Sequence, residues 1–404
     1  MLIAAALCLC ASVATAQVSP TTQTLLVMPF ENQSSAPGLE WLSEAFPEVL
    51  SQRMASPSLY ALGRDDRAYA FDRSGIPGSV LPSRATLYRI AEQMGADYVV
   101  LGSYNFDGKT FSATAQLLDM KKLHLSSAIE SSGPLTDLIV VQTALAWQLL
   151  QQMPSRPAMT REQFLAAWPP IRLDAFENYL RGVLATDRQQ KIHHLHEAIK
   201  LDPNYTQAML ELGRTYYNNH EYESATPWFA RVPQTDPSAG EANFLLGMSE
   251  FYRGNFDKAC TAFSYLLTRV PLPEVYNNVG VAEARRGHRA AAVENFTKAV
   301  NADPNDADYR FNLAVALLRS GDTAGARGQL KEELQRHPGD SEAKTLLDSS
   351  ARTASPPVAS NSLAASNPPR LPLERIKRNY DEASYRQLEL EIRNFNQTRQ
   401  TGAK

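Results

Sequence analysis

Two short stretches of this chain contain residue types that could do chemistry, and the first is Gly108-Lys109-Thr110. These residues match the end of a phosphate-binding loop, whose glycines let backbone amides wrap the phosphates ahead of a helix. Such a loop also needs a glycine where the chain has Ser103, and a helix where "FSATAQLLD" alternates like a strand. Asp107-Gly108 between two alternating strands therefore predicts a hairpin turn, with Lys109 exposed in it.

The second stretch is "HHLH", which places His193, His194 and His196 on one helix. His193 and His196 share a face and could supply two metal ligands, but no third ligand at suitable spacing lies nearby. The chain also lacks the Gly-x-Ser-x-Gly turn of serine hydrolases. We therefore expect no catalytic residue, no metal and no cofactor. A nucleotide- or metal-dependent hydrolase that uses the N-terminal domain remains the alternative.

The elements that surround Gly108-Lys109-Thr110 predict a mixed α/β domain over residues 24–153. Strand patterns occur in "TLLVMPF", "SLYAL", "DYVVLGSYNF", "TFSATAQLLDM" and "LHLSSAIE". Apolar residues at helical spacing predict helices at 42–54, 87–94 and 138–149, and Pro47 should kink or restart the first of them. The predicted order is β-α-β-α-β-β-β-α.

Three segments of this domain carry a resemblance to a known family. They are "LLVMPFEN" (25–32), "GADYVVLGSY" (95–104) and "TAQLLD" (114–119), in the order and spacing of TolB-like N-terminal domains. The resemblance implies a mixed sheet with helices, and it implies protein contacts in the bacterial cell envelope instead of chemistry.

Residues 173–345 contain an internal repeat. Prolines recur at positions 203, 237, 271, 304 and 338, so their spacing is constant to within one position. The same landmarks return between them: a small residue in the first helix (Gly213, Gly247, Gly280, Ala314) and an apolar residue in the second (Phe229, Phe263, Phe296, Leu330). This pattern resembles the tetratricopeptide repeat, a helix–turn–helix unit of about 34 residues. It predicts an all-α solenoid of four clear repeats, preceded by one degenerate repeat.

The resemblance to this repeat implies that the first helix of each unit lines a concave groove. Aromatic side chains mixed with arginine and asparagine in such a groove favour a protein or peptide partner. The candidate partner-binding residues are Arg214, Tyr217, Asn218, Phe244, Met248, Phe251, Tyr252, Asn277, Arg285, Phe311 and Arg319.

The remaining segments are predicted to be a signal, two linkers and a helix. Residues 1–16 form an apolar run with a small-residue cleavage site, which predicts a signal peptide cut between Ala16 and Gln17 and favours a soluble exported protein over a lipoprotein. Linkers are expected at 154–172 and at 346–372, the second of them disordered. Residues 373–400 are predicted to form an amphipathic helix with Tyr385, Leu388, Ile392 and Phe395 on one face. That helix either docks on the solenoid or binds another molecule, and one hypothesis is that it covers the groove until a partner displaces it.

Composition limits the classes of partner. The 404 residues have a net charge of −3, and no basic stripe indicates nucleic acid. No segment after the signal has the apolar length of a transmembrane span. The sequence therefore predicts a non-enzymatic exported scaffold that binds protein or peptide partners in the bacterial cell envelope, in the periplasm or beyond it.

Overall fold

The computed structural model describes residues 22–56, 58–76, 82–154, 158–168, 170–353, 371, 373–380, 385, 388 and 392. The chain divides into two compact units, residues 1–170 and 171–404. The predicted signal peptide, with its cleavage site between Ala16 and Gln17, lies outside the described residues.

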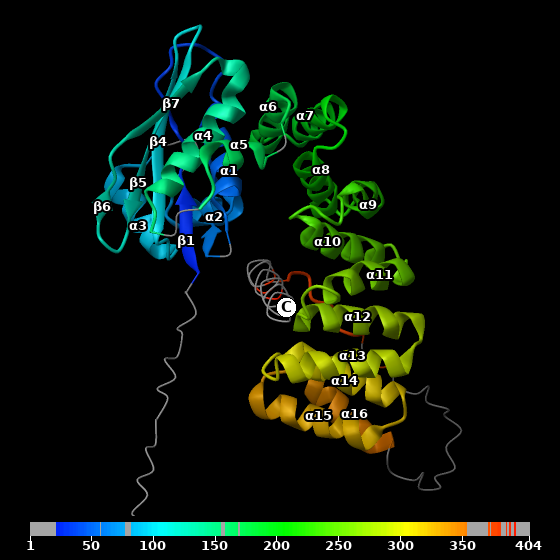
Figure 1. Ribbon diagram of the computed structural model, residues 1–404. Coiled ribbons are helices and arrows are strands. Elements are labelled where there is room, and N and C mark those ends of the chain that lie inside the picture. Colours follow the sequence, from blue (N-terminus) through cyan, green and yellow to red (C-terminus); the bar gives the residue numbers. More distant parts are fainter. Residues whose placement is uncertain are drawn as a thin grey trace, which may run out of the picture. The chain divides into compact units, whose positions relative to one another are not determined.

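The first unit is built on one mixed sheet with helices (Figure 1). Its strands run in the order β3-β1-β4-β5-β6, with β2 paired to β4 and β7 paired to β5. β1 is parallel to β3 and β4, whereas β5 is antiparallel to β4, β6 and β7. The strands are β1 (Gln23–Val27), β2 (Glu31–Asn32), β3 (Leu59–Ala61), β4 (Tyr98–Phe106), β5 (Phe111–Asp119), β6 (His124–Leu125) and β7 (Ile129–Gly133). The prediction of a mixed sheet with helices is confirmed.

The elements of this unit differ from the prediction in three places. The helices are α1 (Leu42–Met54), α2 (Arg64–Arg73), α3 (Arg84–Gln93), the short 3-10 helix η1 (Leu135–Asp137), α4 (Leu138–Gln151) and α5 (Arg161–Ala166). Helix α2 was not predicted, and the single strand expected over 123–130 is two short strands, β6 and β7. The predicted linker at 154–172 contains α5, because Thr160 and Gln163 cap its N-terminus reciprocally and Phe164 is buried.

Helix α1 continues through Pro47 as one helix. A proline lacks the N–H that would bond the carbonyl four residues earlier, which is the carbonyl of Ser43. That carbonyl instead accepts the backbone N–H of Phe30 at 3.0 Å. The Ser43 carbonyl thus has a hydrogen-bond donor from outside the helix, and α1 continues past Pro47 without interruption.

The hairpin predicted at Asp107-Gly108 is confirmed. Strands β4 and β5 pair in register from Tyr98 with Asp119 to Phe106 with Phe111. Gly108 has φ +93°, in the left-handed region that favours glycine, and the Asp107 carboxylate accepts the N–H groups of Lys109 and Thr110 at 2.8 and 2.7 Å. Lys109 is exposed, as predicted.

The second unit is a long run of paired helices stacked one after another (Figure 1). They are α6 (Leu173–Leu184), α7 (Arg188–Leu201), α8 (Thr206–Asn218), α9 (Tyr222–Arg231), α10 (Ala239–Tyr252), α11 (Phe256–Leu267), α12 (Pro273–Arg286), α13 (Arg289–Ala302), α14 (Ala307–Arg319), α15 (Thr323–Arg336) and α16 (Ser341–Thr353). The small-residue landmarks pack as predicted. A Cβ on Gly213, Gly247 or Gly280 would lie 2.6, 2.6 or 2.7 Å from the ring of Phe229, Phe263 or Phe296 in the paired helix.

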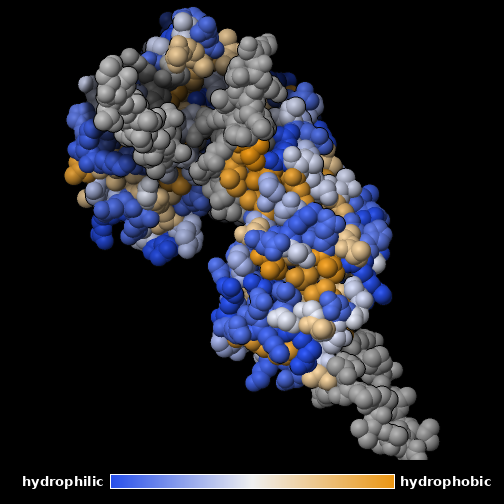
Figure 2. All heavy atoms as spheres, turned by 60° about the horizontal axis from the view of Figure 1, so that its bottom comes forward, coloured by the Kyte–Doolittle hydropathy of each residue, from blue (hydrophilic) through white to orange (hydrophobic). Residues whose placement is uncertain are grey.

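Hydrophobic residues between the paired helices form the core of this unit, and the outer surface of the helices carries both hydrophobic and hydrophilic side chains. On the face seen in Figure 2, hydrophobic side chains gather in separate patches bordered by hydrophilic ones. The last patch of core, around Phe311, Ala314 and Leu330, is covered by Ala343 and Leu346 of α16. The predicted linker at 346–372 is therefore wrong for residues 346–353, because they complete the helix that closes the end of the stack.

The predicted helix at 373–400 is wrong at its start, because residues 373–380 are non-helical. Positions 385, 388 and 392 are helical, and Phe395 lies outside the described residues. Tyr385 is buried, whereas Leu388 and Ile392 are each more than one-third exposed.

Candidate peptide-binding groove

Residues 373–380, called here the tail segment, lie against the first helices of the last repeats. The tail segment runs beside α12 (Figure 1). Arg375 contacts α14, Lys377 contacts α12, and Tyr380 lies on Phe244 of α10 with ring centroids 4.7 Å apart. The tail segment therefore crosses the repeats in the direction opposite to their order in the sequence.

Two asparagines hold the backbone of the tail segment. Asn312 accepts the N–H of Arg375 and donates to its carbonyl, both at 2.7 Å. Asn278 makes the same two bonds to Lys377, both at 2.8 Å. These asparagines occupy equivalent positions of successive repeats, and both are fully buried. One repeat of the solenoid thus matches two residues of the bound strand.

Asn277 strengthens this contact from the side. Its side-chain amide donates to the Arg375 carbonyl at 3.0 Å, and its carbonyl oxygen accepts from Asn312 at 2.7 Å. Because these bonds involve backbone groups of the tail segment, they do not depend on which side chains the bound strand has. Buried amides of this kind require partners, so an empty groove would need water or another peptide in this place.

The Glu374 side chain enters a positively charged site. Its carboxylate forms an ion pair with Arg319 and lies 3.3 Å from Nε of Arg285. The side chain of Glu374 is fully buried, and a buried carboxylate is stable only when it is paired. Arg285 and Arg319 are again equivalent positions of successive repeats.

The Arg375 side chain points into an acidic site. Its guanidinium contacts Asp340 at 2.8 and 3.1 Å and Glu342 at 2.8 Å, and it lies 3.7 Å above the ring centre of Phe311. Burial alone would lower the pKa of Arg375, but the hydrogen bonds to Asp340 and Glu342 outweigh burial and raise it. The same hydrogen bond lowers the pKa of Asp340.

Lys377 is surrounded by carboxylates and an aromatic ring, as Arg375 is, but one repeat earlier in the solenoid. Its ammonium lies 2.7 Å from a carboxylate oxygen of Asp306 and 2.7 Å from one of Asp308. Burial lowers the pKa of Lys377, but the hydrogen bonds to these two carboxylates raise it by more. The ammonium also lies 5.1 Å from the ring centre of Tyr309, at the distance of a cation–π contact.

The candidate residues from the sequence fall into two groups. Those that contact the tail segment are Phe244, Asn277, Arg285, Phe311 and Arg319. Met248 and Phe251 belong to the core beneath it. Towards the N-terminal repeats, Arg214 pairs with Glu241, Tyr217 and Tyr252 pack on Tyr222, and Asn218 is exposed. That a partner contacts these four residues stays a prediction.

Asn278, Asn312 and the carboxylates that face Arg375 and Lys377 were not among the residues predicted from the sequence. A usable signal existed, because each asparagine directly precedes the landmark pair of its repeat, as Asn278-Val279-Gly280 and Asn312-Leu313-Ala314. A buried amide that recurs with the repeat period needs a partner outside its own helix.

The three histidines of the predicted helix have different neighbours. His193 is exposed, His194 lies 3.1 Å from the side-chain oxygen of Asn178, and the His196 ring meets the edge of Trp228. Burial lowers the pKa of both His194 and His196. Among the described residues, no three histidine, cysteine, aspartate or glutamate side chains are placed to share a metal ion.

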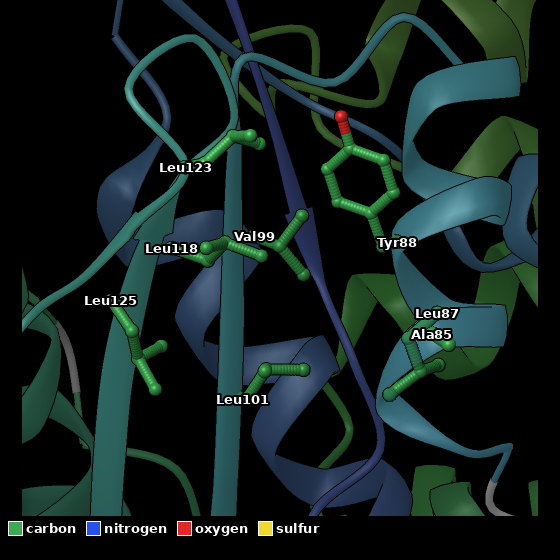
Figure 3. A pocket seen from close by; sticks show the side chains of 8 residues that line it. All are labelled: Ala85, Leu87, Tyr88, Val99, Leu101, Leu118, Leu123 and Leu125. Carbon is green, nitrogen blue, oxygen red and sulfur yellow. The ribbon is translucent and has the colours of Figure 1, made fainter.

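The first unit contains an apolar pocket of about 310 Å³ between α3 and the sheet (Figure 3). Tyr88 has the one polar side-chain group among the residues that line it, which are Ala85, Leu87, Tyr88, Val99, Leu101, Leu118, Leu123 and Leu125. This lining suits an apolar group and offers no acid–base pair.

Comparisons with known proteins identify the second unit. Family models of the tetratricopeptide repeat match residues 192–240, 241–272 and 278–341. The chain thus contains a tetratricopeptide repeat domain in its C-terminal half. Repeat domains of this class suggest a scaffold for protein or peptide partners and are typically non-enzymatic. No family model identifies the N-terminal mixed α/β domain.

Curated relatives align with parts of the chain. A TPR repeat-containing protein of Pseudomonas aeruginosa is 32% identical over 82 residues, which make up 20% of this chain and 34% of that protein. Sperm-associated antigen 1 of Rattus norvegicus is 24% identical over 157 residues, which make up 37% of this chain and 17% of that protein. The chain therefore spans 34% and 17% of the lengths of these relatives.

Solved structures similar to the repeat region include MamA and YrrB. The MamA structure is 21% identical and covers 38% of this chain and 90% of that chain, with a TM-score of 0.36. YrrB, described as a TPR protein with an unusual peptide-binding site, is 17% identical and covers 44% of this chain and 92% of that chain, with a TM-score of 0.40. Among the helices described for our chain, none combines the length and apolar character needed to cross a membrane.

Proposed function

We propose that this protein is a non-enzymatic exported scaffold that binds an extended segment of a partner protein in its repeat groove, in the bacterial cell envelope. One observation supports the groove most directly. Asn278 and Asn312 each bond both backbone groups of one residue in a strand lying across α12 and α14. Such contacts select an extended backbone, which is the form in which a peptide segment can be added to a rigid surface.

The tail segment occupies this groove in place of a partner. Because it belongs to the same chain, its binding is intramolecular and benefits from a high effective concentration. A partner segment must therefore compete with it. Removal of residues 373–404 is expected to raise the affinity for the partner.

Two further parts of the proposal rest on the first unit and the N-terminus. The apolar run with Ala14-Thr15-Ala16 supports export through a signal peptide. The motifs shared with TolB-like domains, which include the paired strands β4 and β5, support a second protein-binding surface on the mixed sheet.

The test uses a groove freed from the tail segment. In the tail-release variant, Arg375→Glu with Lys377→Glu, the new carboxylates face Asp306, Asp308 and Asp340, so repulsion should expel the tail segment while the groove stays native. A fluorescent peptide with the sequence of residues 371–385 is then titrated against this variant of the full mature chain. Saturable binding, lost when Asn278 and Asn312 are both changed to Ala, is expected. No binding to a folded tail-release variant would refute the proposed groove function.

A partner captured from envelope extracts gives the second arm. The tail-release variant should retain more of that partner than the wild-type chain, and the 371–385 peptide should compete it off. Capture that is equal in both chains, and that the peptide does not affect, would place the partner site elsewhere.

A further inference from the structure

We propose that the groove selects partner segments by an ordered pattern of side chains: acidic, basic, apolar, basic, and then an aromatic residue three positions later. This inference rests on the proposed function and specifies its partner. The pattern is that of Glu374, Arg375, Ile376, Lys377 and Tyr380 in the tail segment. The partner is an extended segment of another protein with this chemistry.

The acidic position is defined by two positive charges that converge from successive repeats. Arg285 of α12 and Arg319 of α14 both pair with the fully buried carboxylate of Glu374. A basic residue in its place would bring three positive charges together in a site of low solvent exposure, where Coulomb repulsion is weakly screened.

The two basic positions are defined by carboxylates at the N-terminal ends of α14 and α16. Lys377 meets Asp306 and Asp308. Arg375 meets Asp340 and Glu342, and Asp308 lies 3.3 Å from it as well. Asp306 and Asp340 occupy equivalent positions of successive repeats, and so do Asp308 and Glu342.

Two successive repeats thus contact the strand in a similar way. Asn278 and Asn312 each bond the backbone of one strand residue, and carboxylates at the N-terminal ends of α14 and α16 bond the basic side chains. Since one repeat advances the strand by two residues, basic residues are selected at alternate positions, as observed for Arg375 and Lys377.

The residues between the basic ones must differ from them, because alternate side chains of an extended strand point to opposite sides. Ile376 packs on two apolar clusters of the repeats, one around Met248 and one around Val281. The Tyr380 ring packs on Phe244 at a tilt of 34°, and the ring of Tyr385 lies 2.7 Å from where a Cβ on Gly240 would be. Aromatic residues after the charged pattern therefore continue the contact onto α10.

The test compares charge patterns on one groove. Two labelled peptides are titrated against the tail-release variant of the full mature chain: the 371–385 sequence, and the same sequence with Lys at the Glu374 position and Glu at the Arg375 and Lys377 positions. The first should bind at least about 30-fold more tightly, because three ion pairs become three repulsions. Equal affinity of both peptides would overturn the proposed selectivity and leave the groove function standing. Failure of both peptides to bind would overturn the groove function as well.

A charge exchange in the groove provides an independent arm. With Arg285→Glu and Arg319→Glu added to the tail-release variant, a peptide with Lys at the Glu374 position should bind about 10-fold more tightly than the 371–385 sequence. An unchanged order of affinity would contradict the assignment of the acidic position. Circular dichroism and thermal unfolding establish whether this variant is folded. If it is not folded, the comparison of the two peptides on the tail-release variant tests the proposal.

The mass of the wild-type chain in solution tests the choice of occupant. A monomer, measured by light scattering over a range of concentrations, is expected when each tail segment lies in its own groove. A dimer that dissociates in the tail-release variant would make a second copy of this chain the partner and overturn the assignment to another protein.

Discussion

Replacing Asn278 with Ala removes two hydrogen bonds to the backbone of the bound strand, together with long contacts to Asn277 at 3.4 Å and to the Met248 sulfur at 3.8 Å. Its carboxamide accepts the N–H of Lys377 and donates to the Lys377 carbonyl, both at 2.8 Å. A net hydrogen bond contributes about 1 kcal/mol, so the loss should be about 2 kcal/mol. That energy corresponds to roughly 30-fold weaker binding of the 371–385 peptide to the tail-release variant.

Asn278 is a cleaner position for this test than Asn312. After Asn312→Ala, the Arg375 carbonyl would keep the amide of Asn277, which donates to it at 3.0 Å. The loss at Asn312 should therefore be smaller, about 1–2 kcal/mol.

The assay is a fluorescence anisotropy titration with a matched control. Asn295 of α13 bonds the Ala291 carbonyl of its own helix at 2.9 Å, so Asn295→Ala changes an asparagine of the solenoid without touching the strand. We expect the control to change the affinity by less than about 2-fold, the size of an ordinary surface substitution. An Asn278→Ala affinity within that same range would refute the view that asparagines hold the strand.

Three further predictions concern the fold and the charges. Gly247→Ala should destabilise the protein by about 1–3 kcal/mol, because its Cβ would lie 2.6 Å from a phenyl ring. Gly328→Ala, which has open space around it, should be neutral or slightly stabilising. Thermal unfolding measures both variants, and equal effects would contradict the described packing. Arg375 holds the pKa of Asp340 below its usual 3.8. The contribution of this ion pair to binding of the tail segment is therefore present above that pH and is lost as the pH falls through the lowered pKa. Amide exchange should show the tail segment bound at pH 5, and its release between pH 7 and pH 5 would contradict the pairing. Lys109→Ala should change the free energy of unfolding by less than about 0.5 kcal/mol and leave peptide binding unchanged, because the side chain is exposed in a turn. A loss of stability in denaturant unfolding, or of affinity in the peptide titration, would contradict this prediction.

The repeat fold could be predicted because its spacing and its packing have the same cause. A small residue such as Gly213 is required where a ring such as Phe229 packs against it from the paired helix, and the same requirement returns at Gly247 and Gly280. The hairpin at Gly108 was predictable for a similar reason, because a local φ requirement fixes the residue type.

Other features depend on contacts that are distant in the sequence. Pro47 was expected to interrupt its helix, but Phe30 supplies the missing donor from a separate segment. The tail segment has helical spacing of apolar residues nearby, yet its backbone is bonded by Asn278 and Asn312, which lie far earlier in the chain. Such contacts outweigh local helix propensity because they bond the same backbone N–H and C=O groups that a helix would use.

Residue-resolved amide hydrogen exchange of the wild-type chain tests the central claim most directly. If the groove holds the tail segment through its backbone, the amides of Arg375 and Lys377 exchange at least about 10-fold more slowly than in an unstructured chain. Protection at Lys377 should fall in Asn278→Ala and persist in Asn295→Ala. Exchange of both amides at the rate of an unstructured chain, in a folded solenoid, would contradict the account.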